Sequence, residues 1–144
     1  MGDIEDQIAT VLSRYRMAVL KKDVDAMIAL YADDVRVFDA WGVWKYEGAS
    51  AWREAVEKWF GSLQDETIEV GLEEVRTAGG SDLAVVSAIA TFSAVSAKGE
   101  ELRSMQNRVT WSLARREGAW KIVHEHTSAP IGFEDLKAIL QRQP

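Results

Sequence analysis

The sequence contains no cysteine, two prolines that both lie near its end, and no apolar run long enough to cross a bilayer. Without cysteine there is no disulfide framework, no thiol nucleophile and no thiolate metal site. The longest mostly apolar stretch, LAVVSAIATFSAV at residues 83–95, is too short for a transmembrane helix, and serines and a threonine interrupt it. The N-terminal MGDIEDQ is acidic where a signal peptide is basic and then apolar. These absences predict a cytoplasmic protein that does not bind membranes.

The chain also lacks a basic stripe. Its net charge of −6 arises from 23 acidic and 17 basic residues, and no basic block exceeds Lys21-Lys22 or Arg115-Arg116. Because a nucleic-acid-binding domain concentrates Lys and Arg on one face, this pattern argues against nucleic-acid binding. The length of 144 residues and the 47% hydrophobic content predict one domain, spanning residues 1–144, with a core of its own.

Apolar residues recur at helical spacing in three N-terminal segments. The first apolar stripe comprises Ile4, Ile8, Val11, Leu12, Tyr15 and Val19. A second, shorter helix is expected after Asp23, which can cap it, and a third after Ser50, with Trp52, Val56, Trp59, Phe60 and Leu63 on its apolar face. Three helices are therefore expected before residue 66.

Alternation with a period of two marks the strands. Val35, Val37 and Asp39 alternate with Arg36 and Phe38, and GVWKYEG follows as a short return strand. Four more strands are expected at residues 67–77, 82–96, 101–115 and 119–128, separated by glycine-bearing loops that favour antiparallel hairpins. The tail GFEDLKAIL shows helical spacing and predicts a short helix at about 132–142. The expected class is α+β, with helices on one face of a curved sheet.

The strand at 83–95 is apolar on both faces. Leu83, Val85 and Ile89 lie on one face, and Val86 and Phe92 on the other. Because helices cover only one face of such a sheet, the other face is expected to be buried against a second subunit. The pattern predicts a homodimer formed through the sheet.

The order of elements and the motif YADDV.VFD..G resemble the nuclear transport factor 2-like superfamily, over residues 4 to 130. The segment RYRMAVLKKDVDAMIALYADDVRVFDAWG is similar to the SnoaL-like and ketosteroid isomerase-like branch. The segment RVTWSLARREGAWKIVHEHTSAP is more similar to the calcium/calmodulin-dependent kinase II association-domain branch. The resemblance implies a cone-shaped α+β roll, in which three N-terminal helices pack on a strongly curved mixed sheet.

By the first resemblance, Asp39 takes the place of a general base and Tyr15 that of a hydrogen-bond donor to an enolate oxygen. In ketosteroid isomerase a protonated aspartic acid joins the tyrosine as a second donor. Here the corresponding strand offers only Asn107, and alanine rather than proline follows Asp39. Alternatively, Asp39 is a turn residue before Gly42, and Tyr15 is a core tyrosine.

The remaining candidates are pocket-wall residues. Trp41, Trp44 and Phe60 can form an aromatic wall for a flat apolar ligand, and Asn107 can donate a neutral hydrogen bond. Arg108 binds a ligand if its strand face is concave, and is a surface or interface residue if that face is convex.

His124 and His126 share one face of the last strand in this pattern, together with Trp120 and Ile122. His126 is the preferred pocket residue and a candidate general acid, whereas His124 is a candidate ligand donor. Both can instead be hydrogen-bonded within the sheet. A metal site would need Asp39 or Glu125 as a third ligand, and Glu125 points to the opposite face, so no metal and no cofactor are expected.

Two functional hypotheses remain. One is a cofactor-free isomerase, cyclase or dehydratase that uses the Asp39 carboxylate on a small apolar or aromatic carbonyl compound. The other is a non-catalytic ligand-binding or oligomerisation module, as the C-terminal resemblance implies. The fold does not decide between them, because one fold hosts unrelated activities.

Overall fold

The computed structural model describes residues 3–142. Three helices come from the N-terminal half: α1 (Ile4–Lys21), α2 (Val24–Ile28) and α3 (Ala49–Ser62). The strands are β1 (Tyr31–Phe38), β2 (Tyr46–Glu47), β3 (Thr67–Gly79), β4 (Leu83–Val95), β5 (Glu101–Arg116) and β6 (Ala119–Ser128). The three N-terminal helices and the six strands therefore form in the predicted order, with close boundaries for most of them.

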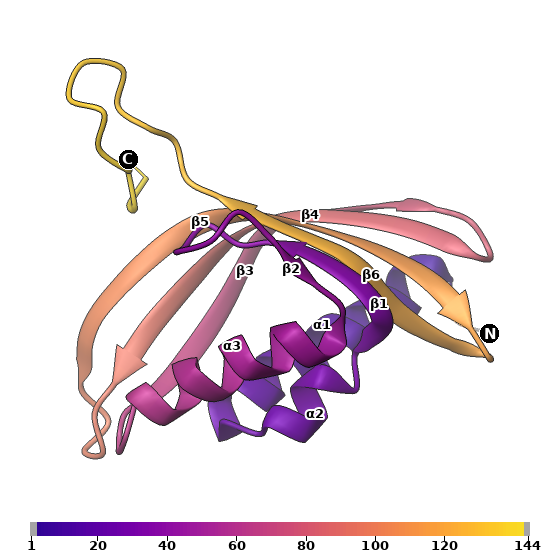
Figure 1. The fold of residues 1–144 in the computed structure, drawn as a ribbon, viewed down its shortest axis with the longest axis horizontal. Helices are drawn as coiled ribbons and strands as arrows, with labels where there is room; N and C mark the ends of the chain where they lie inside the picture. Colours follow the sequence, from indigo (N-terminus) through magenta and orange to yellow (C-terminus); the bar gives the residue numbers. More distant parts are fainter. Residues whose placement is uncertain (1–2, 143–144) are drawn as a thin grey trace.

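The strands make one sheet in the order β2-β1-β6-β5-β4-β3. Neighbouring strands run antiparallel, except that β1 and β6 are parallel. Figure 1 shows the sheet arching over the three helices, which lie beneath its concave face. This arrangement confirms the predicted α+β roll with a curved mixed sheet.

Side-chain caps explain where the first two helices begin. Asp3 accepts a hydrogen bond from the backbone N–H of Asp6 at 2.9 Å, and Asp23 caps α2 in the same way through Ala26 at 3.0 Å. The prediction that Ser50 caps α3 is wrong. The cap position is held by Gly48 at φ 89°, a left-handed conformation that favours glycine, so Ser50 lies inside the first turn.

The core lies between the helices and the concave face of the sheet. Val35 and Val37 on β1 are fully buried, as are Trp111 and Leu113 on β5. The alternate residues of these strands point outward, so one face of each strand supplies the core. This settles the orientation of β5: Asn107 faces the interior and Arg108 faces outward.

A β-bulge in β6 corrects the expected facing of its residues. Leu113 pairs with Ile122 and Ser112 pairs with His124, so Val123 is an extra residue in β6. Because one extra residue reverses the alternation, Ile122 faces the core whereas His124 lies on the outer face. The expectation that the histidines share a face with Ile122 is therefore wrong.

The C-terminal segment is not the expected helix at 132–142. Residues 130–139 form a hairpin-like projection, in which Ile131 and Ala138 make an isolated antiparallel bridge. Figure 1 shows this segment standing away from the sheet. A short helix with no surface against which to bury its apolar stripe is marginal, which explains why helical spacing alone did not produce one.

Within residues 3–142, no helix is long and apolar enough to cross a membrane.

Candidate active site

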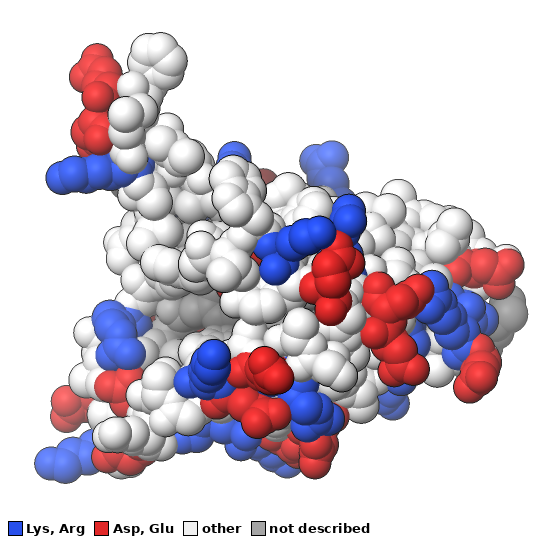
Figure 2. All heavy atoms as spheres, viewed as in Figure 1, with Lys and Arg blue, Asp and Glu red and all other residues white. Residues whose placement is uncertain are grey.

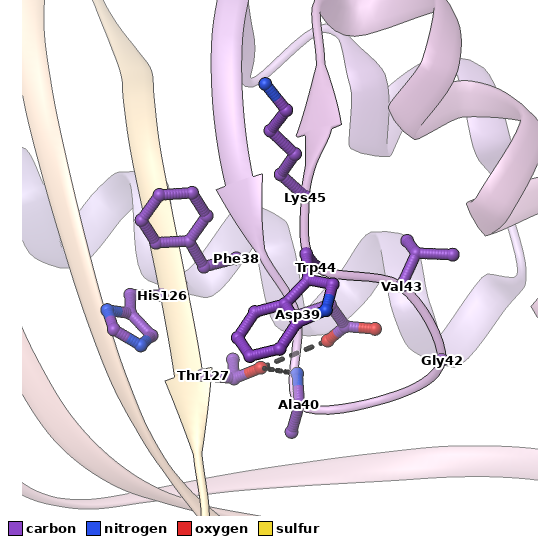
Figure 3. A pocket seen from close by; sticks show the side chains of 9 residues that line it. All are labelled: Phe38, Asp39, Ala40, Gly42, Val43, Trp44, Lys45, His126 and Thr127. Carbon is purple, nitrogen blue, oxygen red and sulfur yellow. Dashed lines mark hydrogen bonds between the residues drawn. The ribbon is translucent and has the colours of Figure 1, made fainter.

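Parallel pairing of β1 and β6 places the ends of both strands at the same edge of the sheet. Phe38 pairs with His126, so the loop after β1 lies beside the last residues of β6. A pocket of about 520 Å³ opens there (Figure 3), lined by Phe38, Asp39, Ala40, Gly42, Val43, Trp44, Lys45, His126 and Thr127.

Asp39 is the carboxylate of this pocket. It continues the inward alternation of β1 and is half-buried. The Thr127 hydroxyl donates to Asp39 Oδ1 at 3.0 Å and accepts from the backbone N–H of Ala40 at 2.9 Å, as the dashed lines in Figure 3 show. Burial raises the pKa of Asp39 above its usual value, although hydrogen bonds from Thr127 and from the backbone at Ala40 and Trp41 oppose that shift.

A second carboxyl group, Glu125, lies deeper on the same strand as Thr127. It is only 3% exposed. Its Oε1 atom accepts hydrogen bonds from the Tyr31 hydroxyl at 2.5 Å and from Trp111 Nε1 at 2.7 Å. Burial, with a further contribution from the charge of Asp39, raises the pKa of Glu125 to about 7. Two interacting carboxyl groups with raised pKa values therefore lie at one end of the core.

Sequence reasoning missed Glu125 as a site residue. The alternation of β6 placed Glu125 on the face opposite the two histidines, and the structure agrees. That orientation was used only to exclude Glu125 as a metal ligand. No sequence signal was available, because the pairing of Glu125 with Trp111 depends on the register that the bulge at Val123 sets. The same register brings in Thr127, opposite Val109.

Tyr15 reaches this cluster from α1. It is buried and packs edge-on against Trp111, with ring centroids 5.3 Å apart. Burial raises the pKa of its hydroxyl, and the charges of Glu125 and Asp39 raise it further. Within residues 3–142 the Tyr15 hydroxyl makes no hydrogen bond, so its proton is free to be donated to a ligand.

Asn107 completes the inner polar group. Its side chain is buried on the concave face, two residues along β5 from Val109, the partner of Thr127. Its Oδ1 atom is enclosed and has no hydrogen-bond partner in the described part of the chain. A buried amide left unpaired is costly, which makes Asn107 a natural contact for a polar ligand group.

The structure separates the other predicted residues from this group. Phe60 is buried in the core and packs on Trp59, with ring centroids 5.0 Å apart. Arg108 is exposed on the convex face, where its Nε donates to Ser128 Oγ at 3.1 Å. It is therefore a surface or interface residue rather than a contact within the cone.

The two histidines also lie on the convex side. His124 Nδ1 is 2.8 Å from the carbonyl oxygen of Arg36, and both imidazole rings pack edge-on against Phe38. His126 lines the pocket from this side, whereas His124 does not. No group of three or more His, Cys, Asp or Glu side chains placed to hold a metal ion occurs between residues 3 and 142.

The tryptophans of the loop after β1 face water. Trp44 lines the pocket and is 95% exposed, and Trp41 is 53% exposed without lining the pocket. Neither ring dries the site in this structure. Asp39 and Thr127 line the pocket, whose outer wall is aromatic and open, whereas Glu125 and Tyr15 are buried behind it and do not line it.

Comparison with known proteins agrees with this architecture. A family model described as a SnoaL-like domain matches residues 8–132. An NTF2-like protein of unknown function from Pseudomonas putida is 28% identical, with a TM-score of 0.86, and the match covers 97% of this chain and 96% of that one. No curated protein matches the sequence.

Two more distant structures show the same fold. The protein Aln2 from a Streptomyces species has a TM-score of 0.77 at 14% identity, covering 89% of this chain and 93% of that one. A Xanthomonas campestris protein, described as a candidate calcium/calmodulin-dependent protein kinase II association domain, has a TM-score of 0.76 at 18% identity and coverages of 90% and 89%. These likenesses confirm the nuclear transport factor 2-like fold expected from the sequence.

Proposed function

This chain belongs to the family of SnoaL-like domains, and on that premise we propose that it binds a small apolar carbonyl compound and moves a proton beside the carbonyl without a cofactor. The observation that carries the proposal is the half-buried Asp39 carboxylate, which lines the pocket and whose pKa is raised by burial. A base of raised pKa keeps a stronger affinity for the proton that it removes.

The proposed step is an enolisation. Asp39 takes a proton from the carbon next to the carbonyl, and the electron pair moves to the carbonyl oxygen. The same carboxyl group then returns the proton to another carbon of the enolate, so that the double bond shifts and no external reactant is consumed. This is the chemistry of an isomerase, and with a leaving group on the enolate it becomes that of a dehydratase.

Two groups in the interior are suited to bind the developing oxyanion. The Tyr15 hydroxyl has no hydrogen-bond partner within residues 3–142, and the side-chain NH2 group of Asn107 on the same concave face can also donate, whereas its unpaired Oδ1 atom is an acceptor. A donor already held in place lowers the barrier because it need not reorganise as charge develops. Both residues are inferred to contact the ligand.

Glu125 is assigned a positioning role. It accepts hydrogen bonds from Tyr31 and Trp111. When it is ionised, its charge raises the pKa of the Tyr15 hydroxyl. With a pKa near 7, burial keeps Glu125 protonated below neutral pH. In that form it adds no negative charge beside the oxyanion, which is the electrostatic condition that enolate formation needs.

Deuterium exchange tests the proposal without knowledge of the natural substrate. A panel of cyclic and aromatic ketones is incubated in heavy water with the wild type, with Asp39→Asn and with a matched control, Asp33→Asn, whose side chain is exposed on β1, the strand that precedes Asp39. Exchange at the α-carbons should fall about 100-fold or more in Asp39→Asn and stay unchanged in the control. Equal exchange in Asp39→Asn and wild type would overturn the proposal.

The second candidate is a non-catalytic ligand-binding or oligomerisation module. The observation that favours it is the convex face of the sheet, where Leu83 is 66% exposed and Val85 is 48% exposed. The likeness to the Xanthomonas campestris protein is consistent with this candidate. Ligands that bind without any exchange would favour it over the enzyme.

Under either candidate we propose a homodimer formed through the convex sheet face. Covering Leu83 and Val85 would remove apolar side chains from water, which stabilises association. Sedimentation velocity of the purified chain tests this directly. A single monomeric species over the accessible concentration range would contradict it.

A further inference from the structure

The C-terminal projection, residues 130–139 and hereafter the finger, carries four exposed apolar side chains. Phe133 is 97% exposed, Leu136 77%, Ile131 68% and Ile139 42%. Soluble monomers rarely expose a contiguous apolar patch that has no use, so such a patch indicates an interaction surface. Figure 2 shows the finger standing clear of the body.

The finger is a built element. The Ile139 N–H donates to the carbonyl of Pro130 at 2.8 Å and closes its base, and the Gly132 N–H donates to the carbonyl of Lys137 at 2.7 Å. A side chain at position 132 would come too close to the carboxylate of Asp135, which would then have to move away. These bonds hold the apolar side chains outward and lower the entropy lost when they are buried.

The finger is also fixed to the sheet. Before residue 108 the edge of β5 has no β6 partner, and there the Gln106 N–H donates to the carbonyl of Leu140 at 2.6 Å. Arg142 adds ion pairs to Glu73 and Glu74 on β3. The chain therefore leaves the sheet after β6, makes the finger, and returns to the same sheet.

A second unpartnered apolar surface lies at the same edge. The loop of residues 40–45, hereafter the pocket loop, follows β1, which runs parallel to β6, so the pocket loop and the finger start side by side. Trp41, Val43 and Trp44 of this loop are 53%, 52% and 95% exposed. The pocket loop forms the open outer wall of the pocket that contains Asp39.

Charge distinguishes the two surfaces. The finger carries Glu134 and Asp135 against one cation, Lys137. Beside the pocket loop, Arg36 and Lys45 share the carboxylate of Glu47 at 2.9 and 3.4 Å, and the other carboxylate of the pocket, Asp39, is half-buried and faces inward, so the outer side of the loop carries more positive than negative charge. An acidic apolar finger thus lies next to a basic aromatic surface on one molecule.

We infer that the second copy of this chain proposed to cover the convex sheet face also binds here, and that each protomer's finger packs against the partner's pocket loop and closes the partner's pocket. A two-fold interface needs one patch that is complementary to itself, and a finger adjacent to its own receptor surface is such a patch. Phe133 and the partner's Trp44 would be the central contacts, because buried aromatic residues carry most of the energy of an interface. This inference depends on the pocket but not on proton transfer by Asp39. It can therefore fail while the proposed function holds, and the reverse is also true.

The absence of native cysteine makes the contact directly testable. One chain carries Lys137→Cys on the finger and another carries Val43→Cys on the pocket loop, which leaves Phe133 and Trp44 in place. A disulfide between the two chains should form at least tenfold faster than between Lys137→Cys and Met17→Cys, a control position exposed on α1. Equal rates would overturn the inference. A chain that carries both Lys137→Cys and Val43→Cys and forms its disulfide only within itself would overturn it as well.

A second measurement uses no cysteine. Phe133→Ala should raise the dissociation constant of the dimer at least tenfold, as expected for a central aromatic residue, whereas Met17→Ala should leave it unchanged. Because Phe133 makes no packing contact in the protomer, its truncation leaves the fold intact, and circular dichroism verifies this. A monomeric wild type, or a dimer that Phe133→Ala does not weaken, would contradict the inference.

Discussion

Replacing Glu125 with glutamine should change how the stability of the protein depends on pH. In the folded chain burial raises the pKa of Glu125 from 4.5 to about 7. Between these two values the unfolded chain has released the proton whereas the folded chain retains it, so the free energy of unfolding falls as pH rises. Below the lower value this contribution is fully present, and above the upper value it is lost.

The pKa values set the size of the effect. One pKa unit corresponds to about 1.4 kcal/mol, so the shift of Glu125 corresponds to about 3 kcal/mol lost between roughly pH 4.5 and 7. Glutamine cannot ionise, yet its side-chain oxygen can still accept hydrogen bonds from Tyr31 and Trp111. Glu125→Gln should therefore lack this part of the decline, and at pH 8 it should be at least as stable as the wild type.

Urea denaturation followed by tryptophan fluorescence, at several pH values, measures the difference between the two proteins. Taking the difference removes the contributions of other titrating groups that both proteins share. Glu57→Gln, which replaces an exposed carboxylate on α3, is the matched control and should follow the wild type. If the free energies of unfolding of Glu125→Gln and wild type change in parallel from acid to alkaline pH, the assignment of Glu125 as a buried protonated acid is refuted.

Three further substitutions probe the surrounding contacts. Thr127→Val removes the hydroxyl that lowers the pKa of Asp39, so the pH at which deuterium exchange becomes half-maximal should rise; an unchanged pH profile would contradict this. Trp111→Phe removes the donor 2.7 Å from Glu125 and should lower the free energy of unfolding by about 1–3 kcal/mol in urea titrations, more at pH 8 than at pH 5. Trp44→Ala should change stability by less than about 0.5 kcal/mol because the ring is exposed, but calorimetry should show weaker binding of aromatic ketones by about 0.5–1.5 kcal/mol.

Much of the fold was predictable because hydrophobic periodicity reports on burial. The change from helical to alternating spacing after residue 66 separates the helices from the meander, and the observed strands follow it. The alternation of Val35, Val37 and Asp39 also gave the inward direction of Asp39 correctly. Local pattern sufficed there because β1 is regular over these residues.

Features that depend on packing between distant segments were not predictable. The extra residue Val123 leaves no sequence signal, yet it decides which residues of β6 join the core and places Glu125 beside Tyr31. The orientation of β5, and with it the separation of Asn107 from Arg108, required the sheet to be assembled. Catalytic roles for Asp39, Tyr15 and His126, and ligand contacts for the remaining candidates, stay predictions.

The C-terminal segment shows where spacing misleads. Phe133, Leu136 and Leu140 are spaced as on a helix, but Phe133 and Leu136 remain exposed in the described part of the protomer. The backbone instead turns at Leu136, at φ 60°, and the Lys137 N–H bonds to the carboxylate of Asp135. Competition from a nearby side chain and the lack of a packing partner together explain the outcome.

The central claim is that Asp39 is a partly desolvated base facing a ligand pocket. Carbon-13 NMR of the labelled aspartate carboxyl groups, titrated with acid and assigned by comparison with Asp39→Asn, measures its pKa directly. The account predicts a pKa above the usual aspartate value in the free protein, and a changed titration of the same signal when an exchanging ketone is bound. An Asp39 signal that titrates at the usual value, and that does not respond to any ligand, would contradict it.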